Sequence, residues 1–312
     1  MPALELANEG PTPTPSSWAE FGGRIIDNIP NAFADGALGG VEAEPLVMGP
    51  PGRWVPRVTA RYLTEGVGHD DAFTFLSGAI PYSFREKSEH SLNFVELTGG
   101  VSSHSELTGS VEFVDRDYKD GKKRVHGDYL AFDYRDSLIG DYRQIAFGDD
   151  WLGVAREARY NIYIPLGRNR KTISTTQTVV PVGTSLVPAV VRENETALYG
   201  GDVEYGWRVF PMDKASIWFL LGAYHFQAGG VSQVWGVKAR TEFRLWDLAR
   251  LSVEFQRDDV FGSNFVFGGE VVFPGTRPRG RPDDCYLTDR LGESVRRWRT
   301  ITLARSTSVD FL

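Results

Sequence analysis

Two-residue alternation of apolar and charged side chains dominates the second half of the chain. From Val237 to Leu245, the odd positions hold Val, Ala, Thr, Phe and Leu, and the even positions hold Lys, Arg, Glu and Arg. Successive side chains on a strand point to opposite faces, so this run predicts a strand with one apolar and one ionic face. Residues 202–209 and 249–256 repeat the pattern. The region from Tyr199 to Phe273 is therefore predicted to be a series of two-faced strands.

The ionic face bears on the fold class. An ordinary half-buried strand carries Thr, Ser or Lys on its outer face, whereas these strands place full charges of both signs opposite an apolar band. This pattern is typical of an all-β, antiparallel transmembrane barrel whose lumen is polar. A soluble antiparallel β-sandwich with a charged outer face would alternate in the same way. Periodicity alone leaves both architectures open.

The rest of the chain adds weaker strand signals. We expect strands from near Trp54 onward and a tight Asp-Gly hairpin turn within 119–122. Residues 171–195 have a β-rich composition that Pro181 and Pro188 interrupt, so two short strands or one long loop are both compatible with the sequence. The total is about twelve strands, as in a medium-sized membrane barrel.

In the barrel interpretation, the charged positions of the strongest strands face the lumen. The predicted lumen-lining residues are Asp202, Glu204, Arg208, Lys238, Arg240, Glu242, Arg244, Arg250, Glu254 and Glu270.

Changes in composition divide the chain into three parts. Residues 1–52 are rich in Pro, Gly and acidic residues and are expected to form a flexible N-terminal segment. Residues 53–274 form the expected barrel, and 275–312 form a C-terminal linker or pore segment. In this last part, Leu287, Leu291, Val295 and Trp298 recur at helical spacing among arginines. A short helix or an extended polar segment there would fit inside a barrel with ionic walls; a surface helix on a sandwich is the alternative.

Composition and charge exclude several classes of protein. The net charge of −7 and the lack of a basic stripe outside the tail argue against a nucleic-acid partner. The single cysteine, Cys285, rules out an intramolecular disulfide. No apolar run approaches the 18 or more residues of a membrane-spanning helix. Met1 to Leu6 lacks the basic and apolar regions of a signal peptide, so for an exported protein we expect the true start to lie elsewhere.

Catalytic and metal-binding motifs are not evident. The five histidines are far apart and none forms a close pair with ligand spacing. The acidic doublets fall at predicted strand ends and loops, where Asp favours turns. There is no phosphate-binding loop, nucleophile elbow or Cys–His arrangement. We therefore expect no enzyme activity, no cofactor and no metal.

The tail also resembles a known family. Arg290 to Ile301 is similar to the segment that closes the barrel of inverse autotransporters, the intimin- and invasin-like outer-membrane proteins, which commonly reads Arg-Met-x-Glu-Pro-Val-x-Arg. Arg290, Glu293, Val295 and Arg297 match it, whereas Leu291 replaces Met and Ser294 replaces Pro. Weaker similarities occur upstream in the family's order, at 161–167, 199–206, 222–226, 236–240 and 258–263.

The resemblance implies a barrel in the bacterial outer membrane with a linker threaded through its pore toward a C-terminal passenger on the cell surface. The protein would then be a translocator and anchor, although Leu312 comes soon after the linker and we expect no passenger domain in this chain. Implied partners are outer-membrane lipid and the barrel-assembly machinery, and the expected state is a monomer. A passive porin-like barrel and a soluble carbohydrate-binding sandwich remain the alternatives. The candidate pore-linker residues are Leu287, Arg290, Leu291, Glu293, Val295 and Arg297.

Overall fold

The computed structural model describes residues 56–69, 71–83, 91–119, 124–212, 215–245, 248–273 and 290–311. The chain divides into two units, 1–47 and 48–312, and all of the described residues belong to the second. The expected flexible segment 1–52, the Asp-Gly turn and the candidate Leu287 lie outside the described residues. No described helix is long and apolar enough to cross a membrane.

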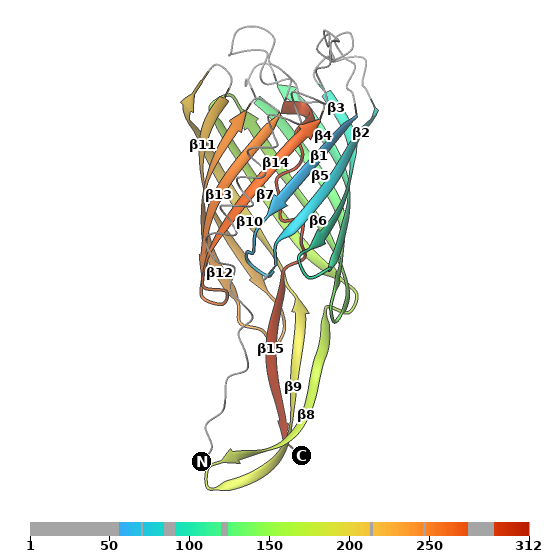
Figure 1. The fold of residues 1–312 in the computed structure, drawn as a ribbon, viewed down its shortest axis with the longest axis vertical. Coiled ribbons are helices and arrows are strands. Elements are labelled where there is room, and N and C mark those ends of the chain that lie inside the picture. The colour runs from blue at the N-terminus through green and yellow to red at the C-terminus, as the bar shows by residue number, and fades with distance from the viewer. Residues whose placement is uncertain are drawn as a thin grey trace. The chain divides into compact units, whose positions relative to one another are not determined.

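Twelve antiparallel strands close into a barrel (Figure 1). Each strand pairs with the next in sequence order, except that β7 pairs with β10 and β14 closes the barrel against β1. This confirms the predicted all-β fold and strand number. The barrel strands are β1 (Arg57–Leu63), β2 (Phe73–Ser83), β3 (Ser91–Ser102), β4 (Leu107–Lys119), β5 (Arg124–Ser137), β6 (Gly140–Gly153), β7 (Arg156–Leu166), β10 (Tyr199–Pro211), β11 (Ala215–Gln227), β12 (Val234–Leu245), β13 (Ala249–Asp258) and β14 (Ser263–Phe273).

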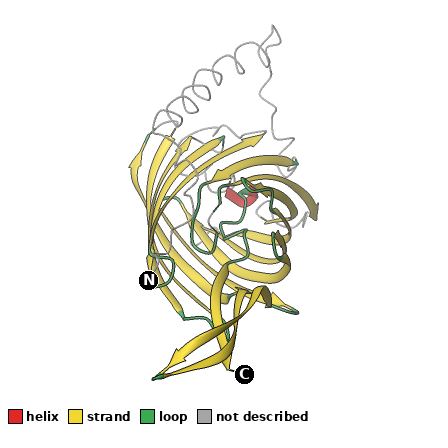
Figure 2. Cartoon of the chain, turned by 60° about the horizontal axis from the view of Figure 1, so that its bottom comes forward, coloured by secondary structure: helices red, strands yellow, loops and turns green. Residues whose placement is uncertain are grey.

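Three further strands form a separate sheet outside the barrel (Figures 1 and 2). β8 (Arg170–Val182) and β9 (Ser185–Ala197) form a hairpin inserted between β7 and β10, and β15 (Leu303–Phe311) adds to the free edge of β9. The expected ranges of 53–274 for the barrel and 275–312 for a pore segment therefore need correction. The sequence of β8 explains the difference, because the run 174–178 is Ser-Thr-Thr-Gln-Thr and offers neither an apolar band for lipid nor an ionic face for the lumen.

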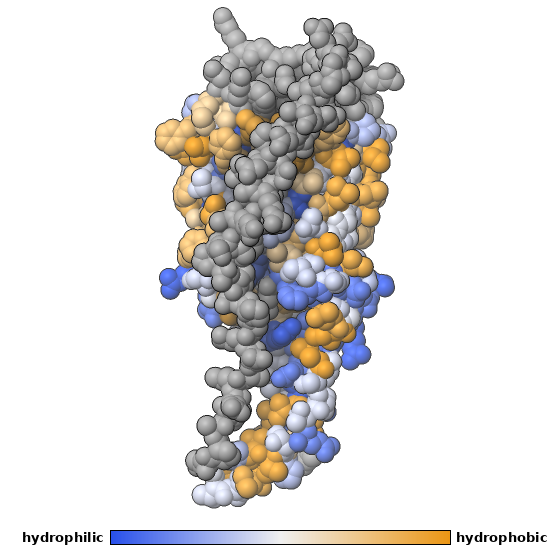
Figure 3. All heavy atoms as spheres, in the orientation of Figure 1, coloured by the Kyte–Doolittle hydropathy of each residue, from blue (hydrophilic) through white to orange (hydrophobic). Residues whose placement is uncertain are grey.

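The burial pattern of the barrel wall is that of a membrane barrel rather than a sandwich. On β4 and β11, the side chain of Glu112 is fully buried, whereas Leu221 is 45% exposed. On β5, Leu130, Phe132 and Tyr134 are exposed while the residues between them are buried. Orange apolar side chains therefore cover much of the visible outer wall (Figure 3). A sandwich buries its apolar face, so this inverted arrangement confirms the transmembrane barrel with a polar lumen.

Candidate functional site

The C-terminal residues 290–302, here called the threaded segment, run through the barrel lumen. At one end, Arg290 donates to the Gly153 carbonyl oxygen at the end of β6 (2.8 Å). At the other end, Leu198 N–H donates to the Thr302 carbonyl oxygen just before β10 begins (2.9 Å). Figure 2 shows this path inside the ring of strands. The prediction of a C-terminal segment in the lumen is confirmed, but its conformation is a short 3₁₀ turn, Arg290–Gly292, followed by irregular chain.

The first residues of the segment are held by ion pairs to the wall. Arg290 contacts Glu157 of β7 (2.6 Å) and its own neighbour Glu293 (2.7 Å). Glu293 in turn contacts Arg250 of β13 (3.0 Å). All of these side chains are at most 10% exposed. Removing one partner from a buried pair is costly because the remaining charge stays out of water, so these contacts fix the segment at this end.

Backbone carbonyls of the 3₁₀ turn are bound by an arginine of the wall. Arg116 of β4 donates to the carbonyl oxygens of Arg290 (3.3 Å), Leu291 (3.2 Å) and Glu293, and its other nitrogen contacts Asp150 of β6 (2.5 Å). The Arg290 carbonyl oxygen also accepts the Glu293 N–H within the turn (3.2 Å), so Arg116 supplements the turn's own hydrogen bond and supplies a donor to the other two carbonyl oxygens. Arg116 and Asp150 were not among the predicted lumen residues, because those came only from the strongly alternating strands after Tyr199. The signal that could have identified them is that each lies at an inward-facing position in the alternation of its strand, β4 for Arg116 and β6 for Asp150.

The middle of the threaded segment forms its most buried contacts. Arg297 contacts both carboxylate oxygens of Asp133 (2.6 and 2.9 Å) and one oxygen of Glu112 (2.9 Å). Arg299 contacts Glu112 (3.0 Å) and Glu96 (2.9 Å). The side chains of these five residues are at most 2% exposed, and they join the segment to β3, β4 and β5. Arg297 was a predicted pore-linker residue, whereas Arg299 and the three acidic residues Glu96, Glu112 and Asp133 were not predicted.

Aromatic packing joins the middle of the threaded segment to β11. The Trp298 ring stacks on Phe226 (centroids 4.8 Å apart, planes at 15°) and meets Tyr224 edge-on (5.2 Å, 62°). The backbone N–H of Trp298 donates to the Tyr163 hydroxyl (2.9 Å). Such aromatic pairs add stability beyond their buried area. Leu291 and Val295 are buried in the apolar cluster that these rings extend.

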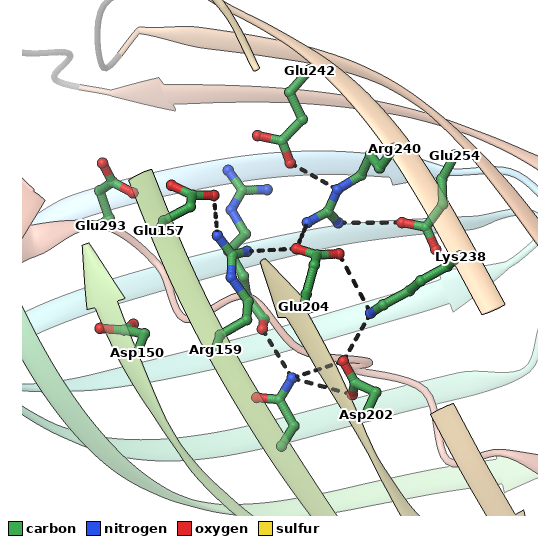
Figure 4. Close-up of polar contacts among 12 residues, drawn as sticks. Asp150, Glu157, Arg159, Asp202, Glu204, Lys238, Arg240, Glu242, Glu254 and Glu293 are labelled. Carbon is green, nitrogen blue, oxygen red and sulfur yellow. Dashed lines mark hydrogen bonds and ion pairs between the residues drawn. The ribbon is translucent and has the colours of Figure 1, made fainter. Parts of the chain in front are cut away.

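The wall itself carries a continuous charge network (Figure 4). Glu204 lies between Arg159 (3.5 Å), Lys238 (3.5 Å) and Arg240. Arg240 also contacts Glu242 (3.1 Å) and Glu254 (3.4 Å). Arg159 and Glu204 lie on the adjacent strands β7 and β10, where opposite charges attract each other, whereas the pairs of Glu204 with Lys238 and Arg240 reach across β11.

The predicted lumen residues thus come together, with one exception. Asp202 and Lys238 pair at 2.8 Å, Arg244 pairs with Glu157 at 2.7 Å, and Glu270 pairs with Arg61 at 2.6 Å and Arg296 at 3.1 Å. Arg208 lies beside a β-bulge near the end of β10, is partly exposed, and has no ion pair among the described residues.

Little space remains beside the threaded segment in this network. A cavity of about 100 Å³ lies between Trp298 and the wall residues Asp202, Glu204 and Lys238. A cavity of this size holds a few water molecules. This cavity beside the threaded segment is therefore too small for a bulky solute.

One group of possible metal ligands lies outside the lumen. His126 and Asp128 of β5 and Asp149 of β6 place ligand atoms within 4.8 Å of one another on the outer face. The sequence shows only separated histidines, because the pairing of Asp128 with Asp149 arises from strand register. Exposed groups of this kind are common without an ion, and nothing else in the described residues points to a ligand there.

Comparisons with known proteins identify the fold. No family model matches the chain, and no curated protein matches it. A chain from a structural study of in-meso crystallization of membrane proteins is 12% identical; the match covers 80% of this chain and all of that one, with a TM-score of 0.55. More distant are an outer-membrane channel of Pseudomonas putida F1 (12% identity, 72% and 97% coverage, TM-score 0.44) and the β domain of the Bordetella autotransporter BrkA (12%, 69% and 96%, 0.32). At 12% identity, the likeness to the first of these chains concerns the fold alone, and it agrees with the membrane β-barrel that the described residues form.

Proposed function

We propose that this protein is an outer-membrane translocator and anchor of the inverse autotransporter type, and that it is not an enzyme. The observation that carries the proposal is the path of the chain. Residues 290–302 run through the lumen, and the chain then continues outside the barrel as β15. A barrel that holds its own C-terminal segment in this way is suited to presenting the next part of the chain on the far side of the membrane.

The lengths of the connections support an orientation. Outer-membrane barrels place short turns in the periplasm and long loops outside. The longest described connection is the insertion between β7 and β10 that contains β8 and β9, and it leaves the barrel at the end where the threaded segment emerges. β14 ends at the opposite end because the strands from β10 to β14 alternate in direction, and β1 begins there because Val58 pairs with Phe273. In this orientation, the chain enters the lumen from the periplasm and leaves toward the cell surface.

The buried ion pairs support anchoring rather than free passage. The threaded segment carries four arginines and one glutamate, and their partners are charged residues of the wall. If the segment slid along the lumen, these charges would lose their partners in a space largely closed to bulk water, which costs free energy. A passive pore would gain nothing from a lumen filled in this way. Lipid around the apolar outer band, help from the barrel-assembly machinery and a monomeric state remain predictions.

The proposal can be tested with an epitope placed after Leu312 in cells that export the protein. We expect antibody or added protease to reach the epitope on intact cells. In planar bilayers, we expect deletion of residues 290–312 to raise the conductance of the barrel strongly. An epitope that becomes accessible only after the outer membrane is permeabilised would contradict the orientation, and an unchanged conductance would contradict the threaded path.

A further inference from the structure

The β8–β9 hairpin is held at its base by contacts that do not involve β15. The Ser137 hydroxyl donates to the Glu195 carboxylate (2.7 Å), and the Tyr142 hydroxyl donates to the Glu195 carbonyl oxygen (3.3 Å). Lys171 contacts the Asp141 carboxylate at 3.2 Å, and its ammonium group lies 4.8 Å from the centre of the Tyr142 ring. The turn between β5 and β6 therefore braces both strands of the hairpin against the barrel rim.

This bracing presents the edge of β9 at the point where the chain leaves the lumen. β9 runs through Leu198 directly into β10, and Leu198 binds Thr302, the last residue of the threaded segment. The next residue, Leu303, already pairs with Ala197 of β9, and the pairing continues without a register shift to Phe311 opposite Ala189. Strand pairing thus begins at the residue where the lumen ends.

Side chains favour this pairing over a random contact. Arg305 lies opposite Glu195, and Asp310 forms an ion pair with Arg192. The Ser308 hydroxyl accepts a hydrogen bond from the Asn194 amide (3.4 Å). Opposite charges on neighbouring strands stabilise a sheet, and a third strand stabilises a hairpin that is marginal alone in water. Most of the binding comes from the backbone, so it makes modest demands on the sequence that is bound.

We propose that the β8–β9 hairpin is a docking site for the exported chain. The free edge of β9 binds residues 303–311 as they leave the lumen and opposes their return. This inference rests on the proposed function, since it assumes that the segment moves outward. Each further hydrogen-bonded pair holds two more residues of the exported segment outside the barrel. Strand pairing therefore favours outward movement of the segment, which the ion pairs in the lumen do not do by themselves.

Backbone geometry provides a matched pair of variants. Hydrogen-bonded pairs alternate along antiparallel strands. Because Leu198 bonds to Thr302, the register makes Ser308 a hydrogen-bonded partner of Arg192, whereas the N–H of Thr307 points to the free edge of β15. Proline removes a needed donor only at the first site, since edge strands tolerate proline where the N–H faces solvent. Ser308→Pro is therefore the test variant and Thr307→Pro its control.

Two hairpin variants test the same idea from the other strand. Replacing 173–193 with Asn-Gly closes the hairpin on the pair Thr172 and Asn194, keeps the bracing residues, and removes the β9 partners of Thr307 to Phe311. Replacing 180–187 with Asn-Gly closes it on Val179 and Pro188 and keeps every β9 partner of β15. Asn-Gly suits both closures because it forms two-residue hairpin turns.

The measurement is the fraction of protein whose C-terminal epitope is accessible on intact cells, with barrel folding checked by the change in gel mobility on heating. We expect Ser308→Pro and the 173–193 replacement to lower this fraction several-fold, and both controls to keep the parent value. Equal accessibility in all four variants would overturn the docking role while leaving the proposed function intact. An inaccessible epitope in the parent protein would overturn both proposals. If Ser308→Pro fails to fold, the 173–193 replacement and its control decide the question.

Discussion

Arg297 and Asp133, 164 residues apart in the sequence, form a two-point ion pair in the barrel lumen. The two nitrogen–oxygen distances are 2.6 and 2.9 Å, and both side chains are fully buried. Paired contacts of this kind fix the orientation of a guanidinium group as well as its position. This pair connects the threaded segment to β5.

The substitution Arg297→Gln should destabilise the folded barrel by roughly 3–5 kcal/mol, because it removes the arginine paired with the buried Asp133 and leaves the buried Glu112 with Arg299 alone. Thermal unfolding in detergent micelles would measure the loss. The control is Arg143→Gln on the outer surface, where the pair with Asp141 spans 3.6 Å and both side chains are at least half exposed. Equal effects of the two substitutions would show that the lumen pair does not hold the segment.

An arginine on the outer wall of the barrel should strongly lower the free energy of unfolding in a lipid bilayer. Leu221 lies at the centre of β11 and is 45% exposed. We expect Leu221→Arg to cost about 2–4 kcal/mol in urea unfolding from phospholipid vesicles, because a charge near the bilayer midplane loses its hydration. The comparison is Leu186→Arg on β9, where a more exposed leucine lies outside the barrel. Similar costs at both sites would argue that Leu221 does not face lipid.

Gly68 is required where the threaded segment leaves the lumen. Its φ is +74°, and a Cβ there would lie 2.4 Å from Thr302 Cγ2 and 2.9 Å from Thr302 Cα. Gly183, at the hairpin tip, has a similar φ of +63° and open space around it. Gly183→Ala should therefore cost only the backbone strain, about 1–2 kcal/mol, whereas Gly68→Ala should cost clearly more. Thermal unfolding would measure the loss of stability in each variant. Equal losses would contradict the inferred close contact between Gly68 and Thr302.

Trp298 should contribute through packing. Replacing it with alanine removes its contacts with Phe226 and Tyr224 and leaves a cavity, so we expect a loss of about 3 kcal/mol. The same variant should raise the conductance of the barrel in planar bilayers, since the vacated space adjoins the cavity beside Asp202. Trp235→Ala is the control, because that ring is 64% exposed. If Trp298→Ala left the conductance unchanged, the barrier to ions would lie elsewhere in the segment.

Alternation along the strands was sufficient to predict the barrel and much of its lumen. The side-chain period of a strand is a local property, so Lys238, Glu242 and Glu254 could be assigned to one face without knowing their partners. The tail's candidates were found through a motif that matches a known family. In contrast, Glu96, Glu112 and Asp133 lie on strands whose alternation was less regular, and they were missed.

Closure of the barrel decided what the sequence could not. Residues 170–197 have the composition of strands, but only the assembled barrel makes β7 a neighbour of β10 and leaves β8 and β9 to pair with β15. The partner of Arg297 likewise depends on the register of every strand between the wall and the tail. The chain's local chemistry thus determined which residues face inward, because that property depends on strand geometry alone. Which of them meet was decided by tertiary structure, because ion pairs across a lumen join residues that no local pattern relates.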